Sequence, residues 1–569
     1  MKAGQAGPPG SGAVSTATMP RITAAGHLAR RARSLHPAVQ GLLALAGYLA
    51  VFIALYAFTL IRHPGLPVVG QGQVDPNFYV WSMRWWPYAI SHGLNPLHSR
   101  QIGAPAGYDL SWTTTTPTVA VILAPVTAAF GPIASFNLTL LLAAPVSAWA
   151  TFLAARRLTR RFWAALMAGA VYGFSPYEVG HTGAGQVNLA VIMLLPLMVY
   201  LVLLWRDGKL GRLLFVGLMA VTMAAEFYIF DEAFAEMTVL AVAGLLIGFA
   251  VARPAERPAV ARLAGLLAVA WVAAIVLASP YVFYALRHRP AVFTKVSPAF
   301  SLNLESLVVP WPGIVLLVIA LGLAVLTWSS RLTRLLVILF VVTVMLAVGP
   351  SPVIGTKQFG QLPWARLWYL PLARSGEPAR VMVFGYLLLA IILAVWLGVP
   401  SRNRLLEASR WVLGLAAVAG ILAYVPHASA GNAIPAAAPS AAARPTAALP
   451  AFIRDGLYRS YLRPGEIVVV VSDRGNAGML FQGDTDFYFR LAGGFVNRSF
   501  SDPSALPVPV EQLMQPTPAR EQQFRAYVHQ AGVGAILVER AWAAPWMRVF
   551  SQMGLHGRLV GGMIVYRTT

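Results

Sequence analysis

A carboxylate stands at the head of an aromatic segment in the first third of the chain. Asp75 precedes Pro76, and four aromatic residues follow with the spacing of one helix face: Phe78, Trp81, Trp85 and Tyr88. In such a place, Asp75 can act as a general base toward a hydroxyl group. Asp followed by Pro is also a preferred way to begin a helix, so both interpretations stay open.

A second group of carboxylates lies between two apolar runs. Its members are Glu226, Asp231, Glu232 and Glu236. Carboxylates at membrane depth are costly, which makes them candidates for substrate binding. The alternative is structural, with Asp231 in a solvated turn and the others paired with an arginine.

Histidine and arginine supply the remaining candidates. His181 lies in a tight connection and could be a general acid or donate to a phosphate, although a lone histidine is more often structural. Arg374 and Arg380 suit bidentate phosphate binding, and the alternative is ordinary snorkelling toward lipid headgroups. We recognise no HExxH motif, no DxD pair and no histidine pair at i,i+4, and we therefore predict no metal site.

The elements that must position these residues are membrane helices. Of the 569 residues, 57% are hydrophobic and 11% are charged, and the mean hydropathy is +0.64. These values exclude an ordinary soluble enzyme, in which about 25% of residues are charged. We expect an α-helical polytopic membrane protein with about eleven spans, near residues 39–61, 134–155, 163–177, 187–205, 211–230, 233–252, 263–286, 311–328, 335–349, 381–399 and 409–425.

The charge pattern predicts the orientation of these spans. The net charge is +22, and most of it lies in the N-terminal segment and in alternate short connections. The positive-inside rule places these connections and the N-terminus in the cytoplasm, and the odd number of spans places the C-terminus outside. The charge therefore marks topology, and no nucleic acid partner is expected. The apolar stretch at residues 117–131 contains two prolines and is predicted to be re-entrant or interfacial, not a span.

The chain divides into four parts. We expect a disordered cytoplasmic tail at 1–36, a membrane domain at 37–426, a linker at 427–449 and an extracytoplasmic α/β domain at 450–569. In the membrane domain, residues 62–116 form the first outer loop, whose aromatic helix is expected to lie on the outer leaflet. In the C-terminal domain, strands are predicted at 466–472, 534–539 and 561–566, and a helix at 508–530. The chain has no cysteine, which excludes disulfides and thiolate chemistry.

Three stretches, at 74–81, 372–380 and 481–494, together with this architecture, resemble the GT-C superfamily of integral membrane glycosyltransferases. Within that superfamily, the chain most resembles large bacterial membrane proteins that carry a C-terminal extracytoplasmic domain. It implies transfer of a sugar from a polyprenyl-phosphate carrier to an extracytoplasmic glycan, lipid or protein. Asp75 would then be the base, and Arg374 and Arg380 would hold the donor phosphate. Asn303 stands where the resemblance leads us to expect an aspartate.

The expected setting is the bacterial inner membrane, with membrane lipids, the polyprenyl-phosphate sugar donor and an envelope glycan or lipid acceptor as partners. The sequence indicates no certain cofactor besides the donor substrate, and dependence on a divalent metal stays open. The alternative is a non-catalytic membrane protein that transports or assembles lipid-linked envelope polymers. The carboxylates lie mainly at the outer ends of spans, which favours surface chemistry over transport.

Overall fold

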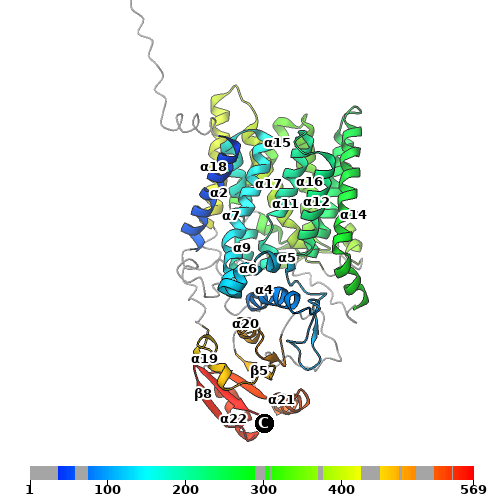
Figure 1. Ribbon diagram of the computed structural model, residues 1–569. Coiled ribbons are helices and arrows are strands. Elements are labelled where there is room, and N and C mark those ends of the chain that lie inside the picture. The colour runs from blue at the N-terminus through cyan, green and yellow to red at the C-terminus, as the bar shows by residue number, and fades with distance from the viewer. Residues whose placement is uncertain are drawn as a thin grey trace, which may run out of the picture.

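The computed structural model describes residues 36–57, 75–288, 301–307, 311–369, 376–424, 449–472, 477–494, 518–540 and 543–568. Each of the eleven apolar runs contains a helix, and these helices form one bundle (Figure 1). They are α2 (Pro37–Phe52), α7 (Pro132–Thr159), α8 (Phe162–Gly173), α11 (Leu194–Arg206), α12 (Arg212–Phe227), α13 (Asp231–Val251), α14 (Arg257–Arg287), α15 (Pro312–Thr327), α16 (Arg331–Val348), α17 (Met382–Gly398) and α18 (Arg404–Tyr424).

Not all of these helices are long. Within the described residues, eight helical segments are long and apolar enough to cross a membrane. They are Pro37–Leu55, Pro132–Thr159, Val187–Arg206, Asp231–Val251, Arg257–Arg287, Arg331–Val348, Pro378–Gly398 and Arg404–Ala423. Helices α8 and α15 are shorter apolar helices, and α12 has 16 residues. The protein is therefore a polytopic helical membrane protein in which some helices fall short of a full span.

Residues 117–131 form two short helices instead of a span. Helix α5 (Pro117–Ile122) ends at Leu123, and α6 (Ala124–Phe130) begins with a proline at its second position. Both contact the aromatic helix α4 (Asp75–Ser91), which runs across one end of the bundle (Figure 1). We call this end of the bundle, next to α4, the α4 end.

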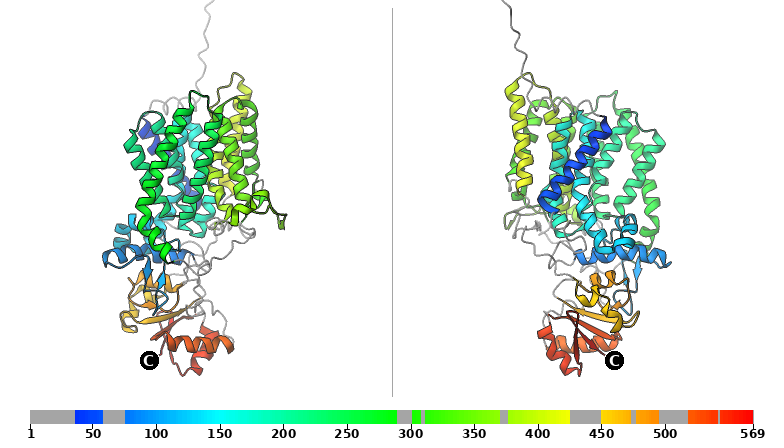
Figure 2. Two further views of the ribbon diagram at one scale, coloured as in Figure 1. Left: turned by 90° about the vertical axis from the view of Figure 1, so that its right-hand side faces the viewer. Right: turned by 60° about the vertical axis from the view of Figure 1, so that its left-hand side comes forward.

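The C-terminal domain lies beyond α4 (Figure 2). Its sheet has the order β6-β5-β7-β9-β8, with β5 parallel to β6 and β7, and β9 antiparallel to β7 and β8. The strands are β5 (Ile467–Val471), β6 (Arg490–Leu491), β7 (Ala535–Glu539), β8 (Gly557–Val560) and β9 (Met563–Arg567). The helices are α20 (Ala477–Asp484), α21 (Pro518–Gln530) and α22 (Ala543–Gln552). Three strands match the predicted positions, and the part of the predicted helix at 508–517 lies outside the described residues.

The aromatic face of α4 packs against this domain. Trp81 is fully buried, and its Nε1 donates to Oε1 of Gln482 at 2.8 Å. Phe487 lies edge-on to the Trp81 and Trp85 rings, with centroids 5.8 and 5.6 Å apart. A Cβ at Gly483 would lie only 3.2 Å from the Trp81 Cα, so glycine permits this approach. The aromatic face thus contacts protein, whereas the sequence predicted contact with the outer leaflet, because the covering α20 comes from a distant part of the chain.

Candidate functional site

Asp75 is held at the first residue of α4 by an amide from another segment. Nε2 of Gln186 donates to Oδ2 of Asp75 at 2.8 Å, and Oε1 of Gln186 lies 2.6 Å from Nδ1 of His181. Since an amide oxygen can only accept, Nδ1 of His181 carries the proton in this contact. The three side chains form one chain of hydrogen bonds, and we call it the Asp75 relay.

Local sequence explains why the relay can form. Helix α9 (Pro176–Ala184) begins with Ser175, whose Oγ accepts the backbone N–H of Glu178, and it ends at Gly185. Gly185 has φ +71°, and a Cβ there would lie 2.8 Å from Cγ of Pro76. Glycine is therefore needed both for the left-handed turn and for the close approach of α4. The turn places Gln186 directly against the first turn of α4.

Burial keeps His181 neutral at neutral pH. Desolvation lowers the pKa of His181 to about 4, with the hydrogen bond to Gln186 acting in the opposite direction and the charge of Arg380 in the same direction. The ring lies edge-on to Tyr177, with centroids 4.5 Å apart. A neutral, buried imidazole is poorly suited to act as a general acid. Its geometry instead suits it to orient Gln186, the structural interpretation left open by the sequence.

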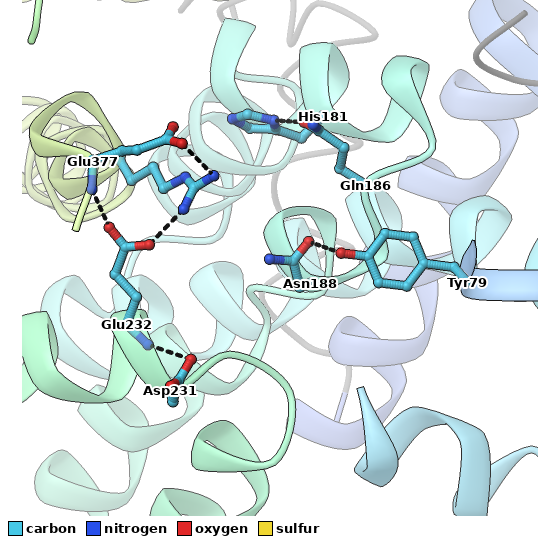
Figure 3. A network of polar contacts seen from close by, with 8 residues as sticks. Tyr79, His181, Gln186, Asn188, Asp231, Glu232 and Glu377 are labelled. Atoms are coloured by element: carbon cyan, nitrogen blue, oxygen red, sulfur yellow. Dashed lines mark hydrogen bonds and ion pairs between the residues drawn. The ribbon is translucent and has the colours of Figure 1, made fainter. Parts of the chain in front are cut away.

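A second contact fixes the next turn of α4. The Tyr79 hydroxyl donates to Oδ1 of Asn188 in α10 (Val187–Ala190), as Figure 3 shows. Burial raises the pKa of Tyr79, and the negative charge of Asp75 adds to this effect. Tyr79 therefore stays protonated and remains a donor at physiological pH. Gln186 and Asn188 bind the same helix one turn apart.

The predicted arginine and one predicted carboxylate form an ion pair. Nη1 of Arg380 lies 2.5 Å from Oε2 of Glu232, and Nη2 lies 3.1 Å from Oε1 of Glu377. The other oxygen of Glu232 accepts the backbone N–H of Glu377 at 2.5 Å (Figure 3). Asp231 accepts the N–H of Glu232 at 3.1 Å. We call Asp231, Glu232, Glu377 and Arg380 the arginine cluster, in which carboxylates outnumber the cation.

Charges in the arginine cluster and in the Asp75 relay affect one another's pKa values. Burial raises the pKa of Glu377, Arg380 opposes this, and the charges of Glu232 and Asp75 raise it further. Arg380 likewise acts on His181. Figure 3 shows Glu377 and His181 in the same view, contributed by different parts of the chain. The structure thus brings Asp75, His181, Asp231, Glu232 and Arg380 together at the α4 end of the bundle.

Other predicted residues lie apart or are engaged elsewhere. Glu226 is 1% exposed at the end of α12, and its Oε2 has no hydrogen-bond partner in the described part of the chain. Arg374 lies outside the described residues. Asp109, a further carboxylate within residues 62–116 that the sequence alone would place in a turn, accepts both the N–H and the hydroxyl of Ser111, at 2.8 and 2.5 Å, which is a turn contact.

Asn303 has a structural reason to be an amide. Its Nδ2 donates to the Gly355 carbonyl at 3.0 Å, and its Oδ1 accepts the N–H groups of Gly355 and Glu305, each at 3.1 Å. An aspartate at this position could accept but not donate when ionised. Asn303 therefore fastens the turn between β3 (Val353–Ile354) and β4 (Lys357–Gln358).

Several residues here were missed by reasoning from the sequence. Gln186 and Asn188 belong to no motif, because neutral amides carry no signal of their own, and sequence reasoning assigned no role to Tyr79 although it lies in the stretch 74–81. The expectation that the chain has no DxD pair was wrong, because Asp484 and Asp486 have this spacing. Asp486 lies 3.7 Å from Nε of Arg84, and burial raises the pKa of Asp484 while the Arg84 charge opposes it. Within the described residues, no group of three His, Cys, Asp or Glu side chains could hold a metal ion.

Solved structures with a similar fold are membrane glycosyltransferases. The chain superposes on the arabinofuranosyltransferase AftD from mycobacteria with a TM-score of 0.58 at 14% identity, covering 94% of this chain and 40% of that one. It superposes on the archaeal oligosaccharyltransferase AglB from Archaeoglobus fulgidus, solved with an inhibitory peptide and a dolichol-phosphate, with a TM-score of 0.54 at 11% identity, covering 93% and 74%.

A third similar structure matches over nearly its whole length. ArnT from Cupriavidus metallidurans, bound to undecaprenyl phosphate, has a TM-score of 0.52 at 12% identity, covering 94% of this chain and 99% of that one. The chain spans less than half of AftD but almost all of ArnT. No protein-family model matches the chain, and no curated protein matches it in sequence.

Proposed function

Because the chain has the fold of the GT-C glycosyltransferases, we propose that it transfers a sugar from a polyprenyl-phosphate carrier to a glycan, lipid or protein acceptor. The observation that carries the proposal is the position of Asp75, held by Gln186 where the membrane bundle meets the C-terminal domain. Two similar structures contain a polyprenyl phosphate, which supports this class of donor. The proposed location is the bacterial inner membrane, with the α4 end facing outward.

In the proposed reaction, Asp75 accepts the proton of the acceptor hydroxyl while that oxygen attacks C1 of the sugar. The bond from C1 to the phosphate oxygen breaks, and the lipid phosphate leaves with its negative charge. The Asp75 relay holds one carboxylate oxygen, Oδ2, and so directs the other toward the substrate. This arrangement suits a base that must be oriented before the substrate arrives.

Arg380 remains the proposed contact to the donor phosphate, but its guanidinium is already paired with carboxylates, the arrangement that the sequence left open as the alternative. Its two terminal nitrogens already meet Glu232 and Glu377. A phosphate would therefore compete with a carboxylate for the guanidinium, and Glu377, the more exposed of the two, is the one we expect to be displaced. The proposed role of Glu232 is to keep Arg380 in place.

The test uses Asp75→Asn and Asp75→Ala in membranes supplied with a labelled polyprenyl-phosphate sugar. Each variant should lose transfer by about 100-fold or more, in the range expected of a general base. Asp109→Asn is the matched control, because Asp109 is a carboxylate in the same connection that serves a turn. Full transfer by both Asp75 variants would end the assignment of a base and leave only a role in beginning α4.

A lipid and glycan profile separates this function from transport. We expect deletion of the protein to remove one sugar from an envelope glycan or lipid while the unmodified acceptor accumulates. Accumulation of an intact lipid-linked glycan would instead support the transport alternative. Mass spectrometry of extracted lipids and released glycans distinguishes the two outcomes.

A further inference from the structure

A polar cavity lies at the end of the bundle opposite α4. Helix α13 begins beside the arginine cluster and runs 21 residues to Val251, so its far end is about 30 Å away. There, residues after α13 and residues at the start of α16 surround a cavity of about 390 Å³. Its lining consists of Val251, Ala252, Arg253, Ser329, Ser330, Arg331, Leu332 and Arg334. We call it the arginine cavity.

The arginine cavity carries excess positive charge. Three arginines line it, and the neighbouring carboxylate is Glu256, which pairs with Nη1 of Arg331 and accepts the N–H of Arg253 at 3.1 Å. These contacts lower the pKa of Glu256, with the Arg253 N–H as the largest cause, so it is ionised at neutral pH. The charge of Arg253 also lowers the pKa of Glu256, so this one carboxylate faces two arginines, while within the described part of the chain Arg334 forms no ion pair with a carboxylate. Two positive charges are therefore left for a ligand.

The cavity also offers hydrogen-bond donors of the kind that anions need. Nε of Arg334 is buried and has no hydrogen-bond partner among the described residues. Ser330 is the N-cap of α16, but its side chain makes no capping bond, so the hydroxyl and the N–H groups of the first turn remain available. Arginine forks, a hydroxyl and a helix N-terminus together match the oxygens of a phosphate.

We propose that the arginine cavity binds a phosphate group, carried either by an anionic phospholipid headgroup or by a soluble phosphate ester. The sequence predicts that arginines at this end of the bundle mark the topology, but a topological marker requires neither a cavity nor a buried N–H without a partner. The proposal concerns a site remote from Asp75 and does not depend on the proposed transfer reaction.

The experiment compares the full chain with Arg253→Gln/Arg334→Gln in lipid nanodiscs. One arm uses mixtures of phosphatidylglycerol and phosphatidylcholine and measures retained lipid by native mass spectrometry. The other arm titrates inorganic phosphate in phosphatidylcholine nanodiscs by calorimetry. The double variant should lose about tenfold or more in affinity, in keeping with the loss of charge-assisted hydrogen bonds. Arg212→Gln is the matched control, because Arg212 begins a helix and does not line the cavity.

Each outcome decides the matter. Retention of phosphatidylglycerol that is lost only in the double variant identifies the headgroup as the ligand. Saturable phosphate binding lost only in the double variant, without lipid preference, identifies a soluble phosphate. Equal behaviour of the double variant and the Arg212 control in both arms overturns the proposal. If the double variant does not elute as a folded protein, Arg253→Gln alone serves, because Arg253 is exposed.

Discussion

Gln186 donates a hydrogen bond to Asp75 across 2.8 Å, although 111 residues of sequence separate them. The same amide accepts from His181, so one neutral side chain joins a carboxylate to an imidazole. An amide in this position cannot exchange a proton with either neighbour at physiological pH. The contact therefore fixes the orientation of the Asp75 carboxylate.

Replacing Gln186 should show how much the orientation of the Asp75 carboxylate contributes to the rate, because the carboxylate that accepts the proton stays in place. Gln186→Leu removes the bond to Oδ2, and a carboxylate that rotates freely spends less time in the productive geometry. We expect kcat to fall by about 10- to 100-fold with little change in KM, as for misplaced catalytic groups. The measurement is transfer from a labelled polyprenyl-phosphate sugar, with Gln522→Leu as the control because Gln522 is exposed on α21. Unchanged kcat in Gln186→Leu would show that Asp75 needs no partner.

His181 should make stability depend on pH. Its pKa in the folded protein is about 4, below the ordinary value of 6.5, so between these values the unfolded chain binds a proton that the folded chain does not. The free energy of unfolding therefore falls as pH falls from 6.5 toward 4, by an amount on the order of 2 kcal/mol. We expect His181→Gln to lose less stability than the wild type over this window, as measured by thermal unfolding in detergent. His556→Gln, which alters an exposed histidine, should behave as the wild type, and equal pH dependence in all three proteins contradicts the prediction.

The arginine cluster should show strong coupling between Arg380 and Glu232. Either Arg380→Leu or Glu232→Leu alone leaves partly buried charges without their partner, whereas the double variant removes both charges. A double-mutant cycle should therefore give a coupling free energy of about 1–3 kcal/mol in thermal unfolding. The exposed pair of Arg454 and Asp455 is the control, and its coupling should be smaller because water screens it. Purely additive effects at Arg380 and Glu232 would mean that their contact contributes nothing to stability.

The contact between the C-terminal domain and α4 should depend on the buried side-chain amide of Gln482. Gln482 is 0% exposed, and besides accepting from Trp81 it donates to the carbonyls of Gln101 and Phe489 at 2.7 and 2.8 Å. Gln482→Leu leaves the indole N–H of Trp81 and the carbonyl of Phe489 buried without this partner, at a cost of about 2 kcal/mol or more, while the Gln101 carbonyl keeps the N–H of Leu491. Thermal unfolding should shift down, and hydrogen exchange should rise across α4. The exposed Gln522→Leu is again the control, and unchanged exchange in α4 would contradict a role for Gln482 in docking.

The sequence predicts the parts of this structure that local pattern controls. Apolar runs must become helices in a membrane, because their backbone groups have no other partner there, and each run contains a helix. The buried strand β7 is also predicted from the sequence, because it begins with an unbroken run of apolar residues. By contrast, β6 has two residues and three of the four residues of β8 are exposed, so neither leaves a pattern.

Contacts between distant segments are harder to foresee. Asp75, His181 and Arg380 stand out in the sequence as charged or titratable groups beside apolar runs, but Gln186 and Asn188 are ordinary amides whose importance arises from where α9 ends. The cover over Trp81 is likewise set by α20, which begins near residue 477. For this reason the aromatic spacing correctly predicts the helix α4, but it does not reveal that the aromatic face of this helix contacts protein and not lipid.

The hydrogen bond between Trp81 and Gln482 can form only late in the synthesis of the residues that make it. The two residues are 401 positions apart, and a ribosome adds about 5–20 residues per second, so the partner of Trp81 is made roughly 20–80 s later. During that interval, the aromatic face of α4 exists without its cover. Tryptophan and tyrosine are at home at a membrane surface, which offers a temporary place for this face. The aromatic face would then leave that surface only after α20, which carries Gln482, has been made.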